Sequence, residues 1–297
     1  MYFLFTNDVE TTSLELNRPA DFMAEKVKKI GLPRVLDLCS KHDIQSTFFF
    51  TADIVQLEPT LVDMVKSGGH EIGCHGLTHD DEYDLMSYNE QLAHLTKAKS
   101  IIEKAANQKI VSFRGPEARI NENTVKALEA AGFKYDSSVC SQRFDGPLSK
   151  GFKKKLSWII APRRPYRLSH RSIGSEGDSK ILEIPVTAFL FPFIGSTMRV
   201  SPGIFRLLKR FIFFEKTDNK AEINFIFHPT EAIELDPSVK PAGPARESFF
   251  TGTARANLKH RNLGLKAVQL MDSIITEAKS LGYKFTTVRK YAEAVGG

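Results

Sequence analysis

Short apolar runs alternate with amphipathic segments along the first half of the chain. Four of the apolar runs are β-prone and predict strands, at residues 2–6, 46–51, 71–73 and 109–113. The segments between them carry apolar residues at near-helical spacing and predict helices, at residues 22–39, 59–66, 87–106 and 122–131. Gly68 and Gly132 suit helix C-caps, and Asn121 suits an N-cap. Strands and helices that alternate at this spacing predict parallel βαβ units.

The pattern becomes looser after Tyr135, where a basic, proline-containing stretch runs to about Gly177. Later elements are expected as strands at 181–186, 223–228 and 285–288, and as a closing helix at 263–281. No segment repeats with a period of about 20 to 50 residues, which argues against a solenoid. We therefore expect a barrel-like α/β fold that forms one domain over residues 1–297, with a basic insertion near 141–178.

The composition is that of an ordinary folded protein. A chain of 297 residues with 42% hydrophobic and 26% charged residues can form a sizeable core, which excludes a disordered or collagen-like protein. The net charge of +6 favours anionic substrates or membrane surfaces only weakly. Three scattered cysteines without a Cys-x-x-Cys pair favour a reducing compartment. Because the first residues lack the basic start and long apolar stretch of a signal peptide, we expect a cytoplasmic protein.

Two histidines follow the third expected strand, in the segment Cys74-His75-Gly76-Leu77-Thr78-His79. If this segment forms a helical turn, the spacing places both imidazoles on one face, a common way to hold a divalent metal. A pair of surface histidines on a loop is the competing interpretation. The position at a strand end favours the metal site, because α/β barrels place their active sites there.

Other strand ends also carry polar side chains. Asp8 and Glu10 follow the first strand and project to the same side if the backbone is extended, so that one can bind a metal while the other acts as a base. An acidic capping turn is the alternative. Arg114 and His228 end two more strands, where a surface ion pair and a packing histidine are the simpler interpretations. Together the four strand ends indicate an active site.

These segments resemble the polysaccharide deacetylases of the NodB-homology type, carbohydrate esterase family 4. The similarity is strongest from Ser46 to Phe50 and from Ser67 to His79. Further matching segments are Phe113–Pro116, Ile120–Thr124, Ala131–Ser138, Leu182–Val186 and Phe227–His228. The resemblance covers roughly residues 2–140 well, and 180–228 and 263–290 more thinly.

The resemblance implies a distorted (β/α)7-type barrel and a metal-dependent hydrolase that removes acetyl groups from N-acetylated sugars. His75 and His79 match the two histidine ligands of zinc or a similar ion such as cobalt, manganese or nickel. Asp8 matches the general base, and Glu10 the third ligand. His228 matches the general acid, and Arg114 the residue that holds the base in place.

The chain departs from the family pattern in three places. The usual Thr-Phe-Asp-Asp-Gly motif is Thr6-Asn7-Asp8-Val9-Glu10 here, and a second alignment makes Asp8 the ligand and puts Asn7, which cannot act as a base, in the base position. Glu117 replaces the usual tyrosine of the Arg-x-Pro-Tyr motif, although its backbone N–H can still face the oxyanion. The Asp/Trp motif has no clear counterpart, with Asp136 nearby.

The basic segment from Arg143 to Arg171 has two interpretations. It can contact a lipid-linked or sugar pyrophosphate or an anionic membrane, with Trp158 and Tyr166 stacking on a sugar ring, or it is a solvated loop. No nucleic-acid-binding module is recognised. The sequence does not define the oligomeric state.

The predicted function is that of a cytoplasmic N-deacetylase. Its substrate is an amino sugar in a surface polysaccharide, or in its nucleotide- or lipid-linked precursor, as in lipopolysaccharide biosynthesis. The enzyme alternative is a hydrolase of another carbon–nitrogen amide bond on the same scaffold. The non-enzyme alternative is a carbohydrate-binding relative without activity, suggested by Asn7 and Glu117.

Overall fold

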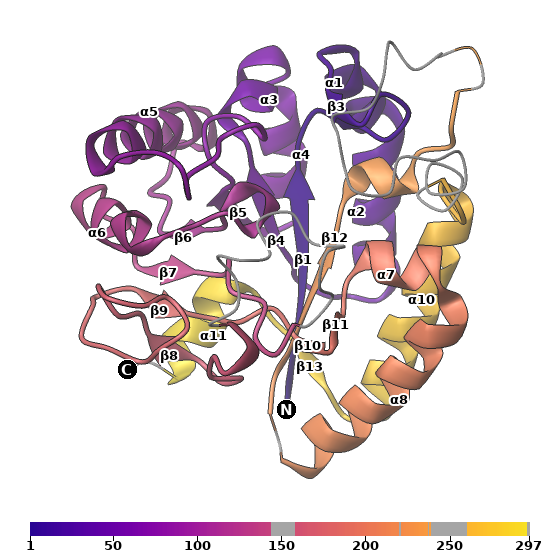
Figure 1. Cartoon of the computed structure of the whole chain (residues 1–297). Coiled ribbons are helices and arrows are strands. Elements are labelled where there is room, and N and C mark those ends of the chain that lie inside the picture. Colours follow the sequence, from indigo (N-terminus) through magenta and orange to yellow (C-terminus); the bar gives the residue numbers. More distant parts are fainter. Residues whose placement is uncertain (144–157, 220, 237, 239–259, 296–297) are drawn as a thin grey trace.

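A single curled sheet forms the centre of the molecule (Figure 1). The computed structural model describes residues 1–143, 158–219, 221–236, 238 and 260–295. The strands follow the order β12-β1-β4-β5-β6-β7-β9-β8, and β13 also pairs with β1. Their bounds are β1 Tyr2–Val9, β4 Thr47–Phe50, β5 Glu71–Cys74, β6 Ser112–Phe113, β7 Tyr135–Asp136, β8 Tyr166–Arg167, β9 Leu182–Glu183, β12 Ile223–Phe227 and β13 Lys284–Phe285. All neighbours are parallel except β8 and β9, which confirms the predicted α/β class.

Hydrogen bonds outside the regular strands bring the two sides of the sheet together. The chain after β9 runs to β12, where the Thr187 amide donates to the Asn224 carbonyl at 3.0 Å. The Asn224 amide donates to Thr187 Oγ1 at 2.9 Å, and its Nδ2 donates to the Ile184 carbonyl at 3.0 Å. The result is a distorted barrel, as the family resemblance implies.

Helices cover the outside of this sheet (Figure 1). Their bounds are α1 Phe22–Lys26, the π-helical turn η1 Val27–Gly31, α2 Leu32–Lys41, α3 Ala52–Leu57, α4 Thr60–Ser67, α5 Tyr88–Ala106, α6 Glu122–Ala130, α7 Gly195–Val200, α8 Pro202–Asp218, α10 Leu265–Ser280 and α11 Val288–Val295. The predicted cap of α6 is confirmed, because Asn121 Oδ1 accepts from the amides of Asn123 and Thr124. Among the described residues, no helix combines the length and the hydropathy needed to cross a bilayer.

The short elements complete the chain. They are β2 Thr12–Ser13, β3 Arg18–Pro19, β10 Ala188–Phe189, β11 Phe191–Pro192, and the 3-10 turns η2 Pro116–Ala118 and η5 Pro229–Ala232. The expected strand at 285–288 is partly wrong. It ends at Phe285, because Thr287 Oγ1 accepts from the Lys290 amide and Val288 begins α11.

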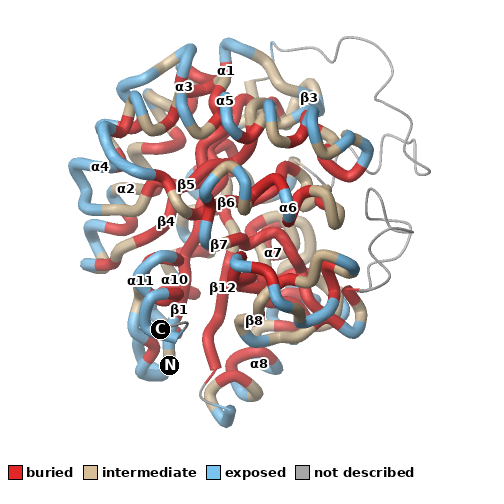
Figure 2. Tube along the Cα trace, turned by 90° about the vertical axis from the view of Figure 1, so that its left-hand side faces the viewer, coloured by how far each residue is buried: buried red, intermediate tan, exposed pale blue. Residues whose placement is uncertain are grey.

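The core lies between the strands and the inner faces of the helices (Figure 2). β1 is buried from Phe3 to Val9, as expected for a parallel strand that is covered on both faces. Close packing of β4 against β5 depends on Gly73, where an added Cβ would lie 2.5 Å from the Phe49 ring. The carboxyl ends of the parallel strands meet at one end of this core.

The expected basic insertion is described only in part. Residues 144–157, which include three consecutive lysines, lie outside the described residues. The part from Trp158 onward contributes β8 to the edge of the sheet.

Candidate active site

Two carboxylates from β1 and the loop after it face the centre of the site. Asp8 and Glu10 are each 3% exposed, and their alternation along an extended backbone turns both side chains to one side. Asn7 points elsewhere, because its Nδ2 donates to Ser46 Oγ at 2.8 Å inside the sheet. The arrangement favours the alignment in which Asp8 and Glu10, rather than Asn7 and Asp8, are the paired acids.

His75 and His79 come from the loop after β5. The segment forms a turn and not the helical turn considered from the spacing, because Gly76 adopts a φ of 86° immediately after His75. Both rings nevertheless reach Glu10. Its Oε2 lies 3.5 Å from Nε2 of His75 and 3.0 Å from Nε2 of His79.

The backbone around the histidines is held by hydrogen bonds. Nδ1 of His75 lies 2.8 Å from the Arg114 carbonyl, so Nδ1 carries the proton and the Nε2 lone pair faces the site. Asp81 Oδ2 accepts from the amides of Leu77 and Thr78 at 2.9 and 3.2 Å, which fixes the turn that leads to His79. The two imidazoles are thus oriented by the protein itself.

Glu10, His75 and His79 fit a divalent metal. One ligand atom from each lies within 4.8 Å of the others. Glu10 Oε2 is buried and accepts no hydrogen bond from the described residues, although two imidazole nitrogens face it. Burial would raise the pKa of Glu10, but His79 and the other nearby histidines outweigh it and lower that pKa to about 2. Two imidazole nitrogens and one carboxylate oxygen are ligands that zinc and related ions accept.

Arg114 holds one oxygen of Asp8 and leaves the other facing the site. Its Nη1 donates to Asp8 Oδ1 at 2.7 Å, while Nε and Nη2 donate to the carbonyl and hydroxyl of Ser137 at 2.9 and 2.8 Å. The guanidinium also lies 4.4 Å from the centre of the Phe49 ring. Asp8 Oδ2 is 3.9 Å from Nε2 of His75 and 3.8 Å from Nε2 of His228.

His228 follows β12 and has a carboxylate on each side. Its Nδ1 lies 3.6 Å from Glu231 Oε2, which also accepts from the His228 amide at 3.2 Å. Burial would lower the pKa of His228, but Glu231, Glu10 and Asp8 outweigh it and raise that pKa to about 9. The ring is therefore protonated at neutral pH in this arrangement.

Glu231 and Arg199 complete the site, and the sequence analysis missed both. Glu231 Oε1 accepts from Nε of Arg199 at 2.8 Å, and both side chains are 2% exposed. The spacing of three residues from His228 to Glu231, with Pro229 between them, could have indicated a one-turn contact. Arg199 lies 32 residues before Glu231, and no local signal joins the two.

The remaining site candidates do not join this cluster. Trp158 and Tyr166 are 2% and 3% exposed, and the Tyr166 hydroxyl donates to the Ile173 carbonyl at 2.8 Å. Buried rings offer no face to a sugar, so we correct the expectation that they stack on one. Glu117 is half-buried in η2 with a φ of 50°.

The Asp/Trp motif of the family has no clear counterpart in this chain, and Asp136 is the residue considered in its place. Asp136 is fully buried and pairs with Glu183 in the register of β7 and β9. Burial raises the pKa of Asp136 to about 6, and burial together with Asp136 raises that of Glu183 well above its ordinary value. Both shifts favour the protonated, uncharged form of these carboxyls within the sheet. In the described part of the chain, neither carboxyl forms a hydrogen bond or ion pair with Asp8, Glu10 or the site histidines.

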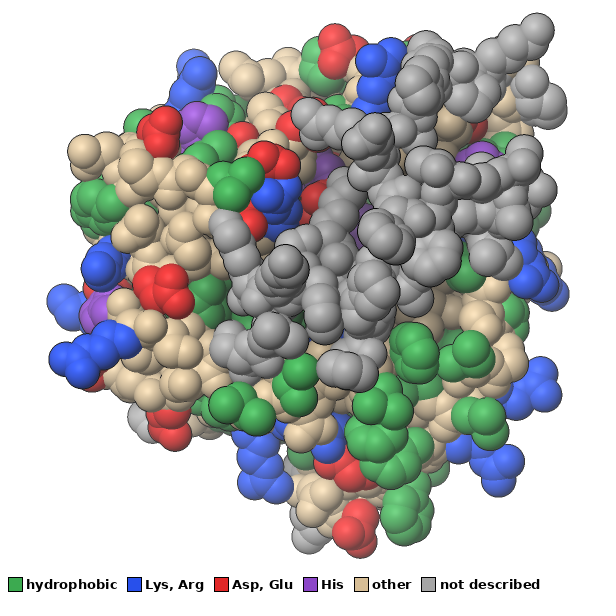
Figure 3. All heavy atoms as spheres, viewed as in Figure 1, with side chains coloured by type: hydrophobic (Ala, Val, Ile, Leu, Met, Phe, Trp, Pro, Cys, Tyr) green, Lys and Arg blue, Asp and Glu red, His purple; other side chains and the backbone are tan. Residues whose placement is uncertain are grey.

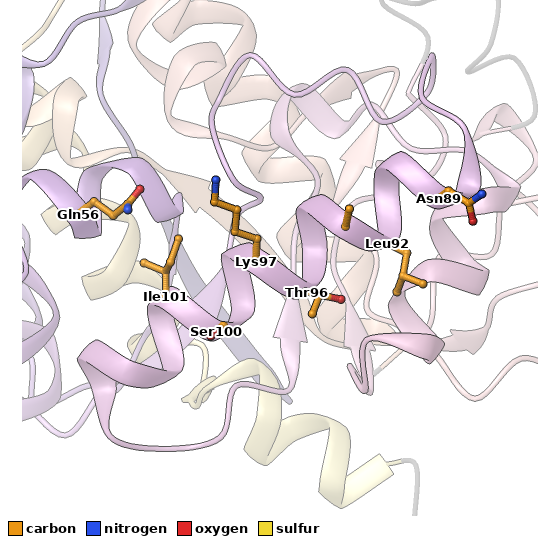
Figure 4. Close-up of a pocket in the computed structure, with 8 residues that line it drawn as sticks. Gln56, Asn89, Leu92, Thr96, Lys97, Ser100 and Ile101 are labelled. Carbon is orange, nitrogen blue, oxygen red and sulfur yellow. The ribbon is translucent and has the colours of Figure 1, made fainter.

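A separate hollow of about 710 Å³ lies on the outside of the barrel. Figure 4 shows side chains along the outer face of α5, including Leu92 and Lys97, with Gln56 of α3 across from them. None of the residues of the strand-end cluster lines it. Figure 3 shows acidic, basic and histidine side chains close together near the upper centre, partly covered by residues that the structure does not describe.

Comparison with known proteins finds a family match within the chain. Residues 27–135 match the family model described as polysaccharide deacetylase. A peptidoglycan deacetylase of Helicobacter pylori is 26% identical over 116 residues, which is 39% of this chain and 39% of that protein. A peptidoglycan-N-acetylglucosamine deacetylase of Bacillus cereus is 35% identical over 102 residues, or 34% of this chain and 46% of that protein. The match thus spans less than half the length of these curated relatives.

Solved structures agree on the fold. A Mycobacterium smegmatis protein assigned to the polysaccharide deacetylases has a TM-score of 0.64 at 18% identity, covering 99% of this chain and 90% of that one. Puue allantoinase has a TM-score of 0.63 at 18% identity, covering 98% and 89%. The chain thus contains a segment that matches the polysaccharide deacetylase family model, and it shares the fold of these solved structures.

Proposed function

We propose that this protein is a metal-dependent hydrolase that removes the N-acetyl group from an amino sugar. The observation that carries the proposal is the convergence of Glu10, His75 and His79 beside Asp8 at the carboxyl ends of the strands. The similarity to a peptidoglycan deacetylase and a peptidoglycan-N-acetylglucosamine deacetylase supports the same reaction.

The residues have separate tasks in this proposal. Glu10, His75 and His79 hold a divalent ion, zinc in the first instance and cobalt, manganese or nickel as alternatives. Such an ion lowers the pKa of water and polarises an amide carbonyl. Asp8 Oδ2 accepts a proton from the attacking water, while Arg114 keeps Oδ1 in place.

The departing nitrogen needs a proton because an amide anion is a poor leaving group. His228 carries that proton at neutral pH, since its pKa is raised to about 9. Water and the N-acetyl group become acetate and a free amine. In this proposal the backbone N–H of Glu117 faces the oxyanion of the tetrahedral state.

The substrate is proposed from chemistry rather than from a bound ligand. An amino sugar of a surface polysaccharide, or its nucleotide- or lipid-linked precursor as in lipopolysaccharide biosynthesis, fits a cytoplasmic enzyme. Contact of the basic segment with a pyrophosphate or membrane stays part of this proposal. Its lysine-rich part lies outside the described residues.

A second candidate is a hydrolase of another amide. The likeness to Puue allantoinase shows only a shared fold at 18% identity, but Glu117 in place of tyrosine adds negative charge beside the family motif. The non-catalytic alternative is suggested in part by Asn7 in the position of the base. The Asn7 side chain is directed away from the site, and two carboxylates, Asp8 and Glu10, face it instead, which argues against that alternative.

Acetate release is the test. Purified protein, loaded with zinc, is incubated with N-acetylated sugars, nucleotide sugars and peptidoglycan fragments. Asp8→Asn is compared with the matched control Asp37→Asn on the exposed side of α2. Acetate from at least one sugar in wild type and control, but not in Asp8→Asn, supports the proposal. Release from ureides or formamides alone supports the second candidate.

A further inference from the structure

Helix α8 exposes a continuous apolar stripe. Ile204, Leu207, Phe211 and Phe214 are spaced by three or four residues and therefore lie on one side of the helix. Leu207 and Phe214 are 69% and 76% exposed. The opposite side, with Phe205, Leu208, Ile212 and Phe213, is buried against the barrel. A helix that is apolar on both sides buries one side in its own protein, and its other side remains apolar and exposed to solvent unless a partner covers it.

The stripe continues onto a neighbouring hairpin. The ring centres of Phe211 and Phe189 are 4.1 Å apart, and Leu190 follows Phe189 at the tip between β10 and β11. Leu190 is half exposed and has a φ of 60°, a conformation that favours glycine or asparagine over leucine. Figure 3 shows apolar side chains gathered over α8 in the lower right.

Positive charge flanks the stripe. Arg206 and Arg210 are exposed on α8, four residues apart, and neither has a carboxylate within ion-pair distance among the described residues. Other cations near α8 are already paired, Lys209 with Glu277 and Arg163 with Glu215. The two arginines are thus available to an anionic partner, in a chain with a net charge of +6.

We propose that this α8 face, defined as Leu190, Ile204, Arg206, Leu207, Arg210, Phe211 and Phe214, docks on an anionic lipid bilayer. The helix lies in the plane of the interface with its apolar stripe below the headgroups, and the two arginines reach lipid phosphates. The charge favours lipid over a second copy of this chain. On the stripe side of α8, Asp218 at the end of the helix is the one exposed carboxylate against the two arginines, so two such faces packed together would each carry a net positive charge.

Vesicle flotation of the full-length protein tests this proposal without any reference to catalysis. Phosphatidylcholine vesicles are compared with vesicles in which about a third of the lipid is phosphatidylglycerol. Leu207→Ser/Phe214→Ser removes apolar contact, and Arg206→Gln/Arg210→Gln removes charge. All four positions are exposed, so these variants are expected to fold. Leu57→Ser, at an exposed leucine of α3 away from this face, is the matched control.

Binding of the wild type and Leu57→Ser to the anionic vesicles, with about tenfold weaker binding of each α8 double variant, supports the proposal. Absence of wild-type binding overturns it, as does equal binding of wild type and the Leu207→Ser/Phe214→Ser variant. Light scattering identifies the competing occupant. A concentration-dependent dimer that the serine variant abolishes, without vesicle binding, assigns the face to a second copy and overturns the lipid assignment.

Discussion

Replacing Glu231 by glutamine removes the negative charge on the Nδ1 side of the His228 ring, opposite the Nε2 atom that faces Asp8. Glu231 Oε2 lies 3.6 Å from Nδ1 of His228, and its Oε1 accepts from Arg199. Burial would raise the pKa of Glu231, but Arg199 and His228 lower it to about 2, so this carboxylate is ionised at every working pH. Glu231→Gln keeps the shape of the side chain and deletes only the charge.

The expected effect follows from the pKa of His228. That pKa is about 9 against an ordinary 6.5, a difference that corresponds to about 3 kcal/mol in favour of the charged ring. Burial opposes the charge, and Glu231 is the largest influence that favours it. Without Glu231 we expect this pKa to fall toward the ordinary value of His. A fall of about two pH units would lower the protonated fraction at pH 8 from about nine tenths to about one tenth.

Two measurements follow this change. In metal-free protein with ¹⁵N-labelled histidine, NMR titration gives the pKa of His228 directly, with His228→Gln to assign the signal. In the active enzyme, the alkaline limb of kcat/KM moves to lower pH, because a general acid must be protonated and loses its proton as the pH rises through its pKa. Near pH 6, where the ring is charged in both proteins, the rates should agree.

Controls separate this electrostatic effect from damage to the fold. Glu231→Gln leaves the Arg199 guanidinium buried without its carboxylate, which costs about 3–5 kcal/mol in comparable cases. Glu231→Asp keeps the charge and should restore much of the pKa, and Arg199→Met/Glu231→Gln removes both buried charges. An unchanged His228 pKa in Glu231→Gln, or a rate that falls equally near pH 6 and pH 8, would refute the reasoning.

Three further predictions concern the base, the sheet and a buried carboxyl pair. Asp8→Asn should lower kcat by about 10²–10⁴ with KM nearly unchanged in steady-state kinetics, because the attacking water loses its proton acceptor. Gly73→Ala should lower the free energy of unfolding by about 1–3 kcal/mol in urea titrations, because the new Cβ would lie 2.5 Å from the Phe49 ring. Asp136 and Glu183 have raised pKa values, so the folded chain keeps protons that the unfolded chain releases, and stability falls as the pH rises from about 4.5 through the folded values. Glu183→Gln should flatten this decline in Tm above about pH 5, and an unchanged slope would contradict the raised pKa of this pair.

The parts of the site that the sequence revealed lie at the ends of strands. Strand ends are readable because apolar runs stop there, and the carboxyl ends of parallel strands meet at one edge. For this reason the sequence alone could group the strand-end residues, among them Asp8, Glu10, His75 and Arg114, into one site. The grouping did not depend on the conformation of the loop after β5, which is a turn and not the helical turn considered from the spacing.

Other features depend on tertiary packing that local patterns do not carry. Arg199 and Glu231 lie 32 residues apart, with helix α8 and strand β12 between them, so neither is conspicuous in its own segment. Trp158 and Tyr166 belong to a basic stretch whose charge suggested exposure, yet both rings pack into the core. Charge density along a chain does not determine which side chains are buried.

Metal content is the most direct test of the central claim that Glu10, His75 and His79 form a metal site beside the base Asp8. Wild type, Glu10→Gln, Asp8→Asn and a control at a remote histidine, His42→Gln, are loaded with zinc, desalted and analysed by elemental mass spectrometry. The account predicts about one ion per chain in wild type, Asp8→Asn and His42→Gln, and little in Glu10→Gln. Full metal content in Glu10→Gln, or loss of metal in Asp8→Asn alone, would contradict it.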